Sequence, residues 1–280
     1  MIKNKMPLHV HSYLRGNKKF PSVWCPGCGL GTILGAIIRG VRALGLDKSN
    51  VAMVSGIGCS GRMPVYVDFC TLHTTHGRAL AFATGLKLAK PGMKVIVVMG
   101  DGDAIAIGGN HFIHSARRNI DLTAIVVNNR IYGMTGGQAS PTTPSGDLAT
   151  TAPFGNVDQP FDISRLAVDA GASFVARSTV FHVLEMERFI ARALSKKGFS
   201  MVEVFSQCAT YYGRLNKKGS AVDMLKWMKE NTTVIKPEDL NQACAVDMAP
   251  KKVERGILVE RDSPGFLEEY AKIVERAKAI

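Results

Sequence analysis

Two short runs of β-branched and apolar residues, each followed at once by polar punctuation, constrain the fold of this chain more than any other feature. Residues 94–99 (KVIVVM) lead into Gly100-Asp101-Gly102-Asp103, and residues 122–127 (LTAIVV) lead into Asn128-Asn129. Continuous apolar runs of this length are typical of strands buried in a parallel sheet. The intervening residues 104–118 have the length of a crossover helix, so this region predicts a strand–helix–strand unit with parallel strands.

The rest of the chain continues this alternation of buried strands and helices. We expect further strands at 51–54 and 200–205, and helices over 30–44, 76–89 and 178–196. The order predicts an α/β fold with a doubly wound, mostly parallel sheet. Residues 133–160 are rich in Gly, Thr, Ser and Pro and predict a long functional loop.

The domain organisation follows from where this pattern stops. We predict one α/β domain over 1–215, because the alternation of strands and helices covers that stretch. Residues 216–280 are expected to form a peripheral C-terminal extension, packed on this domain or on a partner subunit.

Charge and hydropathy limit the function classes. The 280 residues carry a net charge of +12, which favours acidic or phosphorylated partners. Lys and Arg are scattered along the sequence, however, as on an ordinary solvated surface. No apolar run approaches the roughly 18 residues that cross a bilayer, and the N-terminal residues lack the apolar core of a signal peptide. We therefore expect a cytoplasmic protein with no membrane contact.

The two polar strand ends predict a magnesium and diphosphate site. Carboxyl ends of adjacent parallel strands bind ligands, so Asp101 and Asn129 should face each other there. Both offer the oxygen ligands that Mg²⁺ prefers, and the backbone carbonyl of Ile131 could add a third. Gly100 and Gly102 would let a diphosphate approach the backbone. For a lone Gly-Asp-Gly the plainer interpretation is a turn with a helix cap at Asp103, but the second polar strand end favours the site.

The cysteines predict a metal or redox centre. Cys25 and Cys28 are two residues apart, Cys59 lies in a glycine-rich turn after a strand, and Cys208 follows the last predicted strand. A Cys-x-x-Cys pair alone leaves zinc, a redox disulfide and an iron–sulfur cluster open. A [4Fe–4S] cluster needs four thiolates, which these four residues can supply. Cys70 and Cys244 have no place in this pattern and are expected to be small buried residues.

Six motifs occur in an order that resembles the β subunit of 2-oxoacid:ferredoxin oxidoreductases, over about residues 20–215. They are Trp24-Cys25-Pro26-Gly27-Cys28-Gly29, Gly56-Ile57-Gly58-Cys59-Ser60, His76-Gly77-Arg78, Gly100-Asp101-Gly102-Asp103, Asn128-Asn129 and Gly133-Met134-Thr135-Gly136-Gly137-Gln138. The Gly-Asp-Gly…Asn-Asn part resembles the diphosphate-binding motif of thiamine diphosphate enzymes. The resemblance therefore implies a sheet of the thiamine diphosphate-binding, pyrophosphate-domain type.

The resemblance also implies a role for individual residues. The ligands of a [4Fe–4S] cluster would be Cys25, Cys28, Cys59 and Cys208, and those of Mg²⁺ would be Asp101, Asn129 and the carbonyl of Ile131. The residues lining thiamine diphosphate would be Ile57, Gly58, Cys59, Ser60, His76, Gly102, Asp103, Gly133 and Met134. From its position alone, we would expect His76 to be a structural histidine at the start of a helix. The resemblance implies instead that it contacts the cofactor, because the family has a cofactor-contacting histidine at this position.

The implied activity is the reversible, coenzyme A-dependent oxidative decarboxylation of a 2-oxoacid, with electrons passed through the cluster to ferredoxin. The stretch 135–143 is similar to the branch that oxidises 2-oxoglutarate, whose second carboxylate would need a cation. Arg62 is a candidate for this role, and an ion pair with Asp68 or a contact at the subunit interface is its plainer alternative. An α subunit would supply the activating glutamate and the coenzyme A site, in an αβ heterodimer that pairs to (αβ)2.

Three other functions compete with this interpretation. A subunit acting on pyruvate, or on a broad range of branched and other 2-oxoacids, would share the cluster and diphosphate motifs, although broader-specificity relatives can carry Lys at the position of Gly136. A non-oxidative thiamine-dependent decarboxylase would have no use for Cys208. A zinc-stabilised nucleic-acid-binding protein would need a second metal pair close in sequence, but Cys59 and Cys208 are single and distant and aromatic residues make up only 7%. We therefore expect no nucleic-acid partner.

Overall fold

The computed structural model describes residues 10–17, 21–235 and 252–279. Its centre is an eight-stranded sheet with the strand order β2-β1-β3-β4-β8-β7-β10-β9. The strands of this sheet are β1 (Val51–Ser55), β2 (Cys70–His73), β3 (Lys94–Gly100), β4 (Thr123–Asn128), β7 (Phe174–Thr179), β8 (Ser200–Phe205), β9 (Thr232–Val234) and β10 (Val253–Glu260). A separate two-stranded ribbon joins β5 (Ile131–Tyr132) and β6 (Gln138–Ala139).

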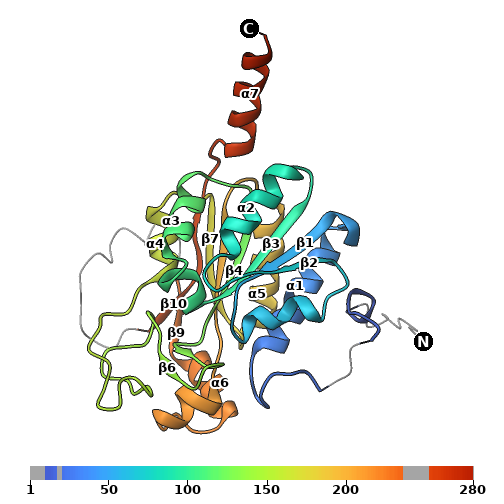
Figure 1. Cartoon of the computed structure of the whole chain (residues 1–280). Coiled ribbons are helices and arrows are strands. Elements are labelled where there is room, and N and C mark those ends of the chain that lie inside the picture. The colour runs from blue at the N-terminus through green and yellow to red at the C-terminus, as the bar shows by residue number, and fades with distance from the viewer. Residues whose placement is uncertain (1–9, 18–20, 236–251, 280) are drawn as a thin grey trace.

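Helices cover both faces of the sheet, as the doubly wound prediction requires. The helices are α1 (Leu30–Ala43), α2 (Ala79–Ala89), α3 (Gly109–Arg117), α4 (Ile163–Asp169), α5 (Val183–Ser195), α6 (Ala221–Glu230) and α7 (Phe266–Lys278). Shorter helical turns are η1 (His11–Tyr13), η2 (Lys48–Asn50), η3 (Ser60–Val65), η4 (Gly102–Ala106) and η5 (Ala209–Gly213). In Figure 1, α2, α3 and α4 lie in front of the sheet, and α1 and α5 lie behind it.

The alternation of side chains along each strand divides the core into these two layers. Ile96 and Val98 of β3 pack in the cluster that contains α1 and α5. Val95 and Val97 of the same strand pack in the cluster with α2, α3 and α4. Because both faces are buried, the strand must be apolar at every position, which is why the predicted runs are continuous rather than alternating.

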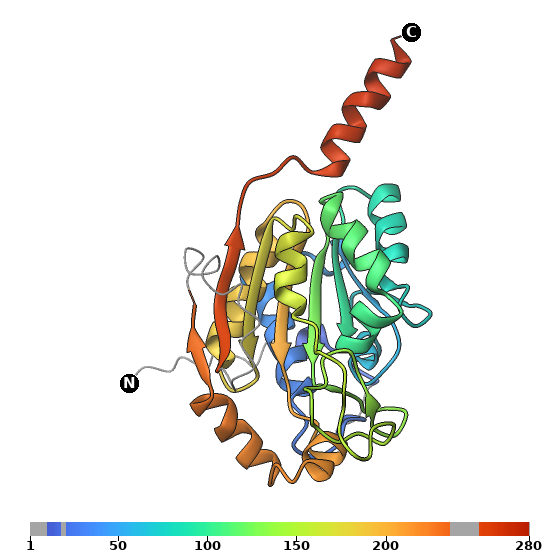
Figure 2. The same cartoon turned by 90° about the vertical axis from the view of Figure 1, so that its left-hand side faces the viewer.

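Six neighbouring strands of this sheet run parallel, namely β2, β1, β3, β4, β8 and β7. Their carboxyl ends therefore meet at one edge of the sheet. The sharp turns that follow β3, β4 and β8 lie at this edge, as do the β5–β6 ribbon and α6 (Figures 1 and 2). This edge positions the candidate site described below.

Three predicted helices are too long. The helix predicted over 104–118 is divided into the π-helical turn η4 and α3. Gly108 lies between them, at a position where a Cβ would lie 2.3 Å from the carbonyl oxygen of Asp103. The helix predicted from His76 begins at Ala79, since Gly77 turns the chain with a φ of +70°. The helix predicted over 178–196 begins at Val183, because Ser178 and Thr179 belong to the missed strand β7.

The C-terminal residues contribute to the main sheet. Strand β10 pairs antiparallel with β7, and β9 pairs parallel with β10 at the sheet edge. Helix α7 follows and projects from the end of the sheet opposite to α6 (Figures 1 and 2). The predicted boundary at residue 215 stays a prediction. Within the described ranges, no helix has the length and apolarity needed to span a bilayer.

Candidate active site

A cavity of about 170 Å³ lies at the carboxyl ends of β1, β3 and β4. It is lined by Leu30, Ile57, Gly58, Cys59, Ser60, His76, Gly100, Asp101, Gly102, Asp103, Val127, Asn129, Ile131, Tyr132, Gly133, Met134 and Thr135. Every residue that we predict to contact thiamine diphosphate or Mg²⁺ is in this set. The structure therefore brings together residues that lie as far apart in the sequence as Ile57 and Met134. We call this space the cofactor cavity.

Asp101 is buried directly after β3, and a nearby loop orients its carboxylate. Ser140 Oγ donates to Asp101 Oδ2 at 2.6 Å, and Thr142 Oγ1 donates to the same oxygen at 2.5 Å. Burial raises the pKa of the Asp101 carboxyl, and the two hydroxyls act in the opposite direction. Both hydroxyls bind Oδ2, and no side chain in the described ranges donates a hydrogen bond to Oδ1.

The two asparagines at the end of β4 have different contacts: Asn128 is the last residue of the strand and Asn129 follows it. Asn129 Oδ1 accepts a hydrogen bond from the backbone N–H of Ile131 at 3.3 Å, which forms a tight turn at the cavity. Asn128 is buried and donates through Nδ2 to Glu203 Oε1 at 2.8 Å. Between the turn residues, Arg130 has a φ of +62°, a conformation that is uncommon for residues other than glycine. The donor set of Asp101, Asn129 and the Ile131 carbonyl is the oxygen-rich kind that suits Mg²⁺.

The carboxylate of Asp103 connects the turn after β3 to the segment that holds His76 and Gly77. Its Oδ1 accepts from His76 Nδ1 at 2.7 Å and from the Gly77 N–H at 2.6 Å. Its Oδ2 is buried and has no hydrogen-bond partner within the described structure. Burial raises the pKa of the Asp103 carboxyl, which the backbone N–H of Gly77 and the neighbouring His76 oppose. The sequence suggested a helix cap here, but this side chain bridges two distant segments.

Two glycines are required by close approach in this cavity. A Cβ at Gly102 would lie 2.2 Å from ring carbons of Tyr132, and a Cβ at Gly56 would lie 1.9 Å from Asp103 Oδ2. Neither position has space for any other residue. Glycine at 102 is therefore required by the Tyr132 ring and glycine at 56 by the Asp103 carboxylate, and Gly102 itself lines the cofactor cavity.

A second cavity, of about 100 Å³, gathers the four predicted cluster ligands. Cys25, Cys28, Cys59 and Cys208 all line it, and we call it the cysteine cavity. The pKa of the Cys28 thiol is raised to about 11, mainly by burial, and the other three thiols contribute to the rise. A Cβ at Gly133 would lie 3.5 Å from Cys208 Sγ and 3.8 Å from Cys59 Sγ. These contacts place the four sulfurs around one space.

Local contacts hold the three segments that carry these thiols. Trp24 Nε1 donates to the carbonyl of Cys59 at 2.8 Å, which joins the Cys25–Cys28 loop to the turn after β1. Gln207 Nε2 donates to the carbonyl of Gly27 at 2.6 Å, which joins the same loop to the end of β8. The π-helical turn η5 begins directly after Cys208. Turns of this type occur frequently at functional sites.

The sulfurs do not form a compact mononuclear site. Within the described ranges, no three His, Cys, Asp or Glu side chains are close enough to hold one metal ion. A tetrahedral zinc ion with Zn–S bonds of about 2.3 Å would need its thiolates within about 4 Å of one another. A four-iron cluster is larger, because each thiolate binds a different iron. The four thiols that line this cavity match the four ligands that such a cluster needs.

Two other cysteines and one arginine complete the comparison with the sequence predictions. Arg62 lines the cysteine cavity rather than the cofactor cavity, and its suggested partner Asp68 pairs with Lys48 instead. Cys70 was expected to be buried but is exposed on the edge strand β2, because that strand has a solvated face. Cys244 lies outside the described residues.

The sequence analysis did not identify the residues that hydrogen-bond to Asp101 and Asn128 and so orient them. Ser140 and Thr142 were expected to lie in a functional loop and in the stretch that is similar to the 2-oxoglutarate branch, but no contact with Asp101 was predicted for them. Glu203 lies in a strand predicted from its apolar character, yet it accepts hydrogen bonds from Asn128, Ser164 and Arg177. An acidic residue inside a buried strand was the available signal, because such a charge needs a partner.

Comparisons with known proteins agree with this geometry. Residues 48–204 match the family described as "Thiamine pyrophosphate enzyme, C-terminal TPP binding domain". The chain is similar to the 2-oxoglutarate synthase subunit KorB of Methanothermobacter thermautotrophicus, with 49% identity over 94% of this chain and 91% of the relative. It is 55% identical to the KorB subunit of Archaeoglobus fulgidus, over 81% of this chain and 82% of that one.

A solved structure is similar over nearly the whole chain. It is the 2-oxoglutarate:ferredoxin oxidoreductase from Magnetococcus marinus, with 2-oxoglutarate, coenzyme A and succinyl-CoA bound. The sequence identity is 34% and the TM-score is 0.85, and the match covers 96% of this chain and 90% of the other.

Proposed function

The chain belongs to the thiamine pyrophosphate enzymes and, within them, to the β subunits of 2-oxoacid:ferredoxin oxidoreductases, and we propose that it forms the cofactor-binding part of a 2-oxoglutarate:ferredoxin oxidoreductase. The proposed reaction is the reversible oxidative decarboxylation of 2-oxoglutarate to its coenzyme A thioester. Ferredoxin is the proposed electron acceptor. The β-subunit name of the relatives implies an α partner, and we propose that this partner supplies the activating glutamate and the coenzyme A site.

The observation that carries this proposal is the contact between the two cavities. The cofactor cavity and the cysteine cavity share five lining residues, which are Leu30, Cys59, Asn129, Gly133 and Met134. An oxidative enzyme needs its electron donor and electron acceptor next to each other, and a non-oxidative decarboxylase has no such need. The shared wall therefore supports the oxidoreductase over the non-oxidative alternative.

In the cofactor cavity, the proposed task of the chain is to hold the diphosphate through Mg²⁺. Asp101, Asn129 and the carbonyl of Ile131 would bind the metal, while Gly102 and Asp103 would lie beside the diphosphate. Ser140 and Thr142 hold the Asp101 carboxylate in a single orientation, which reduces the entropy that metal binding must remove. When bound, thiamine diphosphate supplies the electron sink for loss of CO₂, and the iron–sulfur cluster accepts the electrons that are released.

His76 and Asp103 form a pair with a proposed role in binding or proton transfer. A carboxylate can only accept, so Asp103 keeps the imidazole proton on Nδ1 and leaves Nε2 free. The side chain of His76 is 34% exposed in the free chain, which leaves it accessible to a substrate that enters the cavity. We propose that Nε2 binds the substrate or the cofactor.

Arg62 remains our proposal for the second carboxylate of 2-oxoglutarate. It lines the cysteine cavity together with Cys59, Gly133 and Met134, which also line the cofactor cavity. Arg62 is exposed and makes no ion pair in the described part of the chain, so its charge is available to an anionic substrate. An arginine is suited to this role because its guanidinium binds a carboxylate in a bidentate manner.

The test is anaerobic co-expression with the α subunit, followed by iron, sulfide and thiamine analysis of the purified complex. We expect a brown protein whose visible absorbance dithionite bleaches, and coenzyme A-dependent reduction of methyl viologen with 2-oxoglutarate. If methyl viologen is reduced faster with pyruvate or with branched 2-oxoacids than with 2-oxoglutarate, the faster substrate replaces 2-oxoglutarate in the proposal. A colourless complex that decarboxylates without reducing viologen would support the non-oxidative enzyme. We also propose that the complex is cytoplasmic and assembles as (αβ)2.

A further inference from the structure

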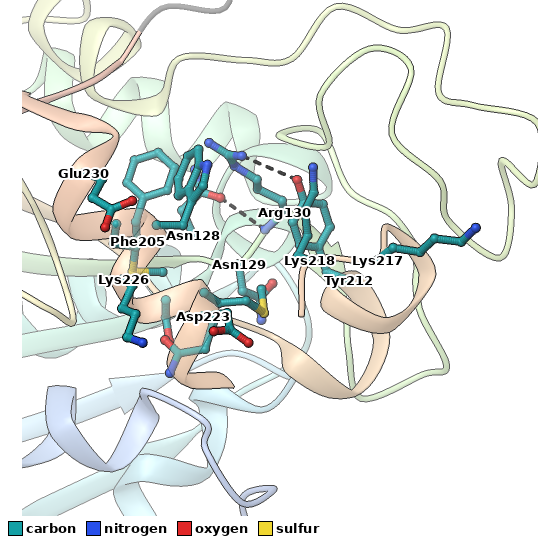
Figure 3. Close-up of a pocket in the computed structure, with 15 residues that line it drawn as sticks. Asn128, Asn129, Arg130, Phe205, Tyr212, Lys217, Lys218, Asp223, Lys226 and Glu230 are labelled. Carbon is teal, nitrogen blue, oxygen red and sulfur yellow. Dashed lines mark hydrogen bonds between the residues drawn. The ribbon is translucent and has the colours of Figure 1, made fainter. Parts of the chain in front are cut away.

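A hollow of about 440 Å³ lies beside both cavities of the site and is larger than either. One wall consists of the residues that end β4 and β8, namely Asn128–Arg130 and Phe205–Gln207. The opposite wall is α6 and the segment that precedes it, as Figure 3 shows. Asn129 lines all three spaces, and Gln207 lines both this hollow and the cysteine cavity. We call it the α6 hollow.

Arg130 brings a positive charge into the α6 hollow. Its guanidinium lies 5.3 Å from the ring centre of Phe205 and 5.5 Å from that of Trp227. Its polar contact in Figure 3 is a long hydrogen bond of 3.4 Å to Tyr212 Oη. Arg177 also approaches the Phe205 ring but is paired with Glu203, whereas Arg130 has no carboxylate partner within the described structure. The charge of Arg130 is therefore free to attract an anionic group.

The rim of the hollow adds more positive charge. Lys217, Lys218 and Lys226 line it, so with Arg130 there are four cations against the two carboxylates of Asp223 and Glu230. Asp223 is already engaged, because it accepts hydrogen bonds from Ser220 N and Oγ in the capping box that begins α6. Lys218 Nζ lies 3.7 Å from Asp147 Oδ1. Lys217 and Lys226 make no ion pair in the described ranges.

The exposed face of α6 extends this surface outside the hollow. Lys229 is exposed and lies 6.0 Å from the ring centre of Phe181. Two apolar side chains lie among these lysines, since Val222 is 58% exposed and Trp227 is 42% exposed. An apolar centre with a charged rim is the usual composition of a protein-binding surface, and Trp and Arg are the residues most enriched at its energetic centre. A small anion would need only the hollow and not this outer face.

Helix α6 also lies directly against the cluster-binding loop. A Cβ at Gly27 would lie 2.4 Å from the Cβ of Ala221, the first residue of α6. Gln207 ties the carbonyl of Gly27 to the end of β8. A protein bound on α6 would therefore lie next to the Cys25–Cys28 loop, of which Cys25 is exposed.

We propose that the α6 hollow and the lysines around it form the docking surface for the acidic ferredoxin that accepts electrons. This inference rests on the proposed function, because it assumes that the cysteine cavity holds the cluster. Acidic side chains of the ferredoxin bind Arg130 and the rim lysines, and Trp227 lies at the centre of the contact. The surface thus brings the partner next to the Cys25–Cys28 loop, which lines the cysteine cavity. Complementary charge speeds this association and makes it sensitive to salt.

The test is the double variant Lys226→Glu/Lys229→Glu in the complete, cluster-loaded αβ complex. Binding of oxidised ferredoxin from the same organism is measured by calorimetry, and its KM is measured in the 2-oxoglutarate reaction. We expect both the Kd and the KM for ferredoxin to rise at least tenfold, with a weaker dependence of KM on salt. The rate with methyl viologen and the affinity for thiamine diphosphate stay unchanged, because neither lysine lines the cofactor cavity.

The matched control is Lys272→Glu/Lys278→Glu on α7, at the opposite end of the molecule (Figure 2). It has the same change of charge and should leave ferredoxin binding unaltered. A ferredoxin Kd within twofold of the wild type, or an equal loss in the control, would overturn the proposal. Dissociation of the αβ complex in the α6 variant would also overturn it, since α6 would then contact the α subunit. Failure of the wild-type complex to reduce viologen instead contradicts the proposed function.

Discussion

Ser140 Oγ donates a hydrogen bond to Asp101 Oδ2 over 2.6 Å, and so connects the long loop after β5 to the carboxylate at the end of β3. Thr142 binds the same oxygen and lies 3.0 Å from Asn128 Oδ1. The loop therefore orders both strand ends that we expect to bind Mg²⁺. Loss of a residue that orients a metal ligand in this way typically lowers metal affinity or activity roughly 10–100-fold.

We predict that Thr142→Val weakens the Mg²⁺-dependent binding of thiamine diphosphate by about tenfold, the lower limit for loss of such an orienting group. The valine keeps the shape of the side chain but cannot donate to Asp101 Oδ2. Calorimetry at several Mg²⁺ concentrations measures the effect. Thr142→Ser retains the hydroxyl and should restore the affinity. Equal affinities for the valine variant and the wild type would contradict the role of Thr142.

A second prediction separates the cluster from the cofactor. Cys208→Ala should remove the visible absorbance and most of the bound iron, because a [4Fe–4S] cluster needs four thiolates. Thiamine diphosphate binding should persist, since Cys208 lines the cysteine cavity and not the cofactor cavity. Cys70→Ala is the control, because Cys70 lies exposed on β2. Loss of iron in the control as well, or full iron content in Cys208→Ala, would refute the ligand assignment.

A third prediction concerns the space around Asp103. In Gly56→Ala the new Cβ would lie 1.9 Å from Asp103 Oδ2, so the carboxylate must move and its bond to His76 is lost. We expect thiamine diphosphate affinity to fall more than tenfold. Gly85→Ala in α2 is the control, because a Cβ there meets nothing within 4 Å. The helix propensity of alanine should even stabilise that variant by up to about 1 kcal/mol. Unchanged cofactor affinity in Gly56→Ala would show that the His76–Asp103 pair is dispensable.

The sequence predicted those parts of the site that depend on a short local pattern, such as a buried strand followed by a polar turn. A buried strand followed by Gly100-Asp101-Gly102 must turn at the sheet edge, so Asp101 and Asn129 could be placed together from two strand ends. The strand at Phe174–Thr179 was missed because Ser178 and Thr179 are polar, and they are buried in the ladder with β8, which no local pattern shows. The contact of Thr142 with Asp101 depends on how a long loop folds back, which no local pattern specifies.

The last prediction concerns Glu203, whose buried carboxylate connects the end of β4 to α4 and to the neighbouring strand β7. It accepts from Asn128 Nδ2, Ser164 Oγ and Arg177 Nε, and the guanidinium of Arg177 is itself buried. Glu203→Gln keeps the shape but leaves Arg177 with Asp162 as its remaining carboxylate partner. Removing one partner of a buried ion pair typically costs about 3–5 kcal/mol of unfolding free energy.

We expect the thermal midpoint of the αβ complex to fall markedly in Glu203→Gln, and Mg²⁺-dependent cofactor binding to weaken with it, because Asn128 loses a charged acceptor. Glu260→Gln is the matched control, since it breaks the half-exposed pair with Arg192. A surface pair of this kind is worth at most about 1 kcal/mol. If both variants unfold at the same temperature, the buried network contributes no more than a surface pair. The hydrogen bonds behind Asn128 then cannot be what orders the metal-binding turn.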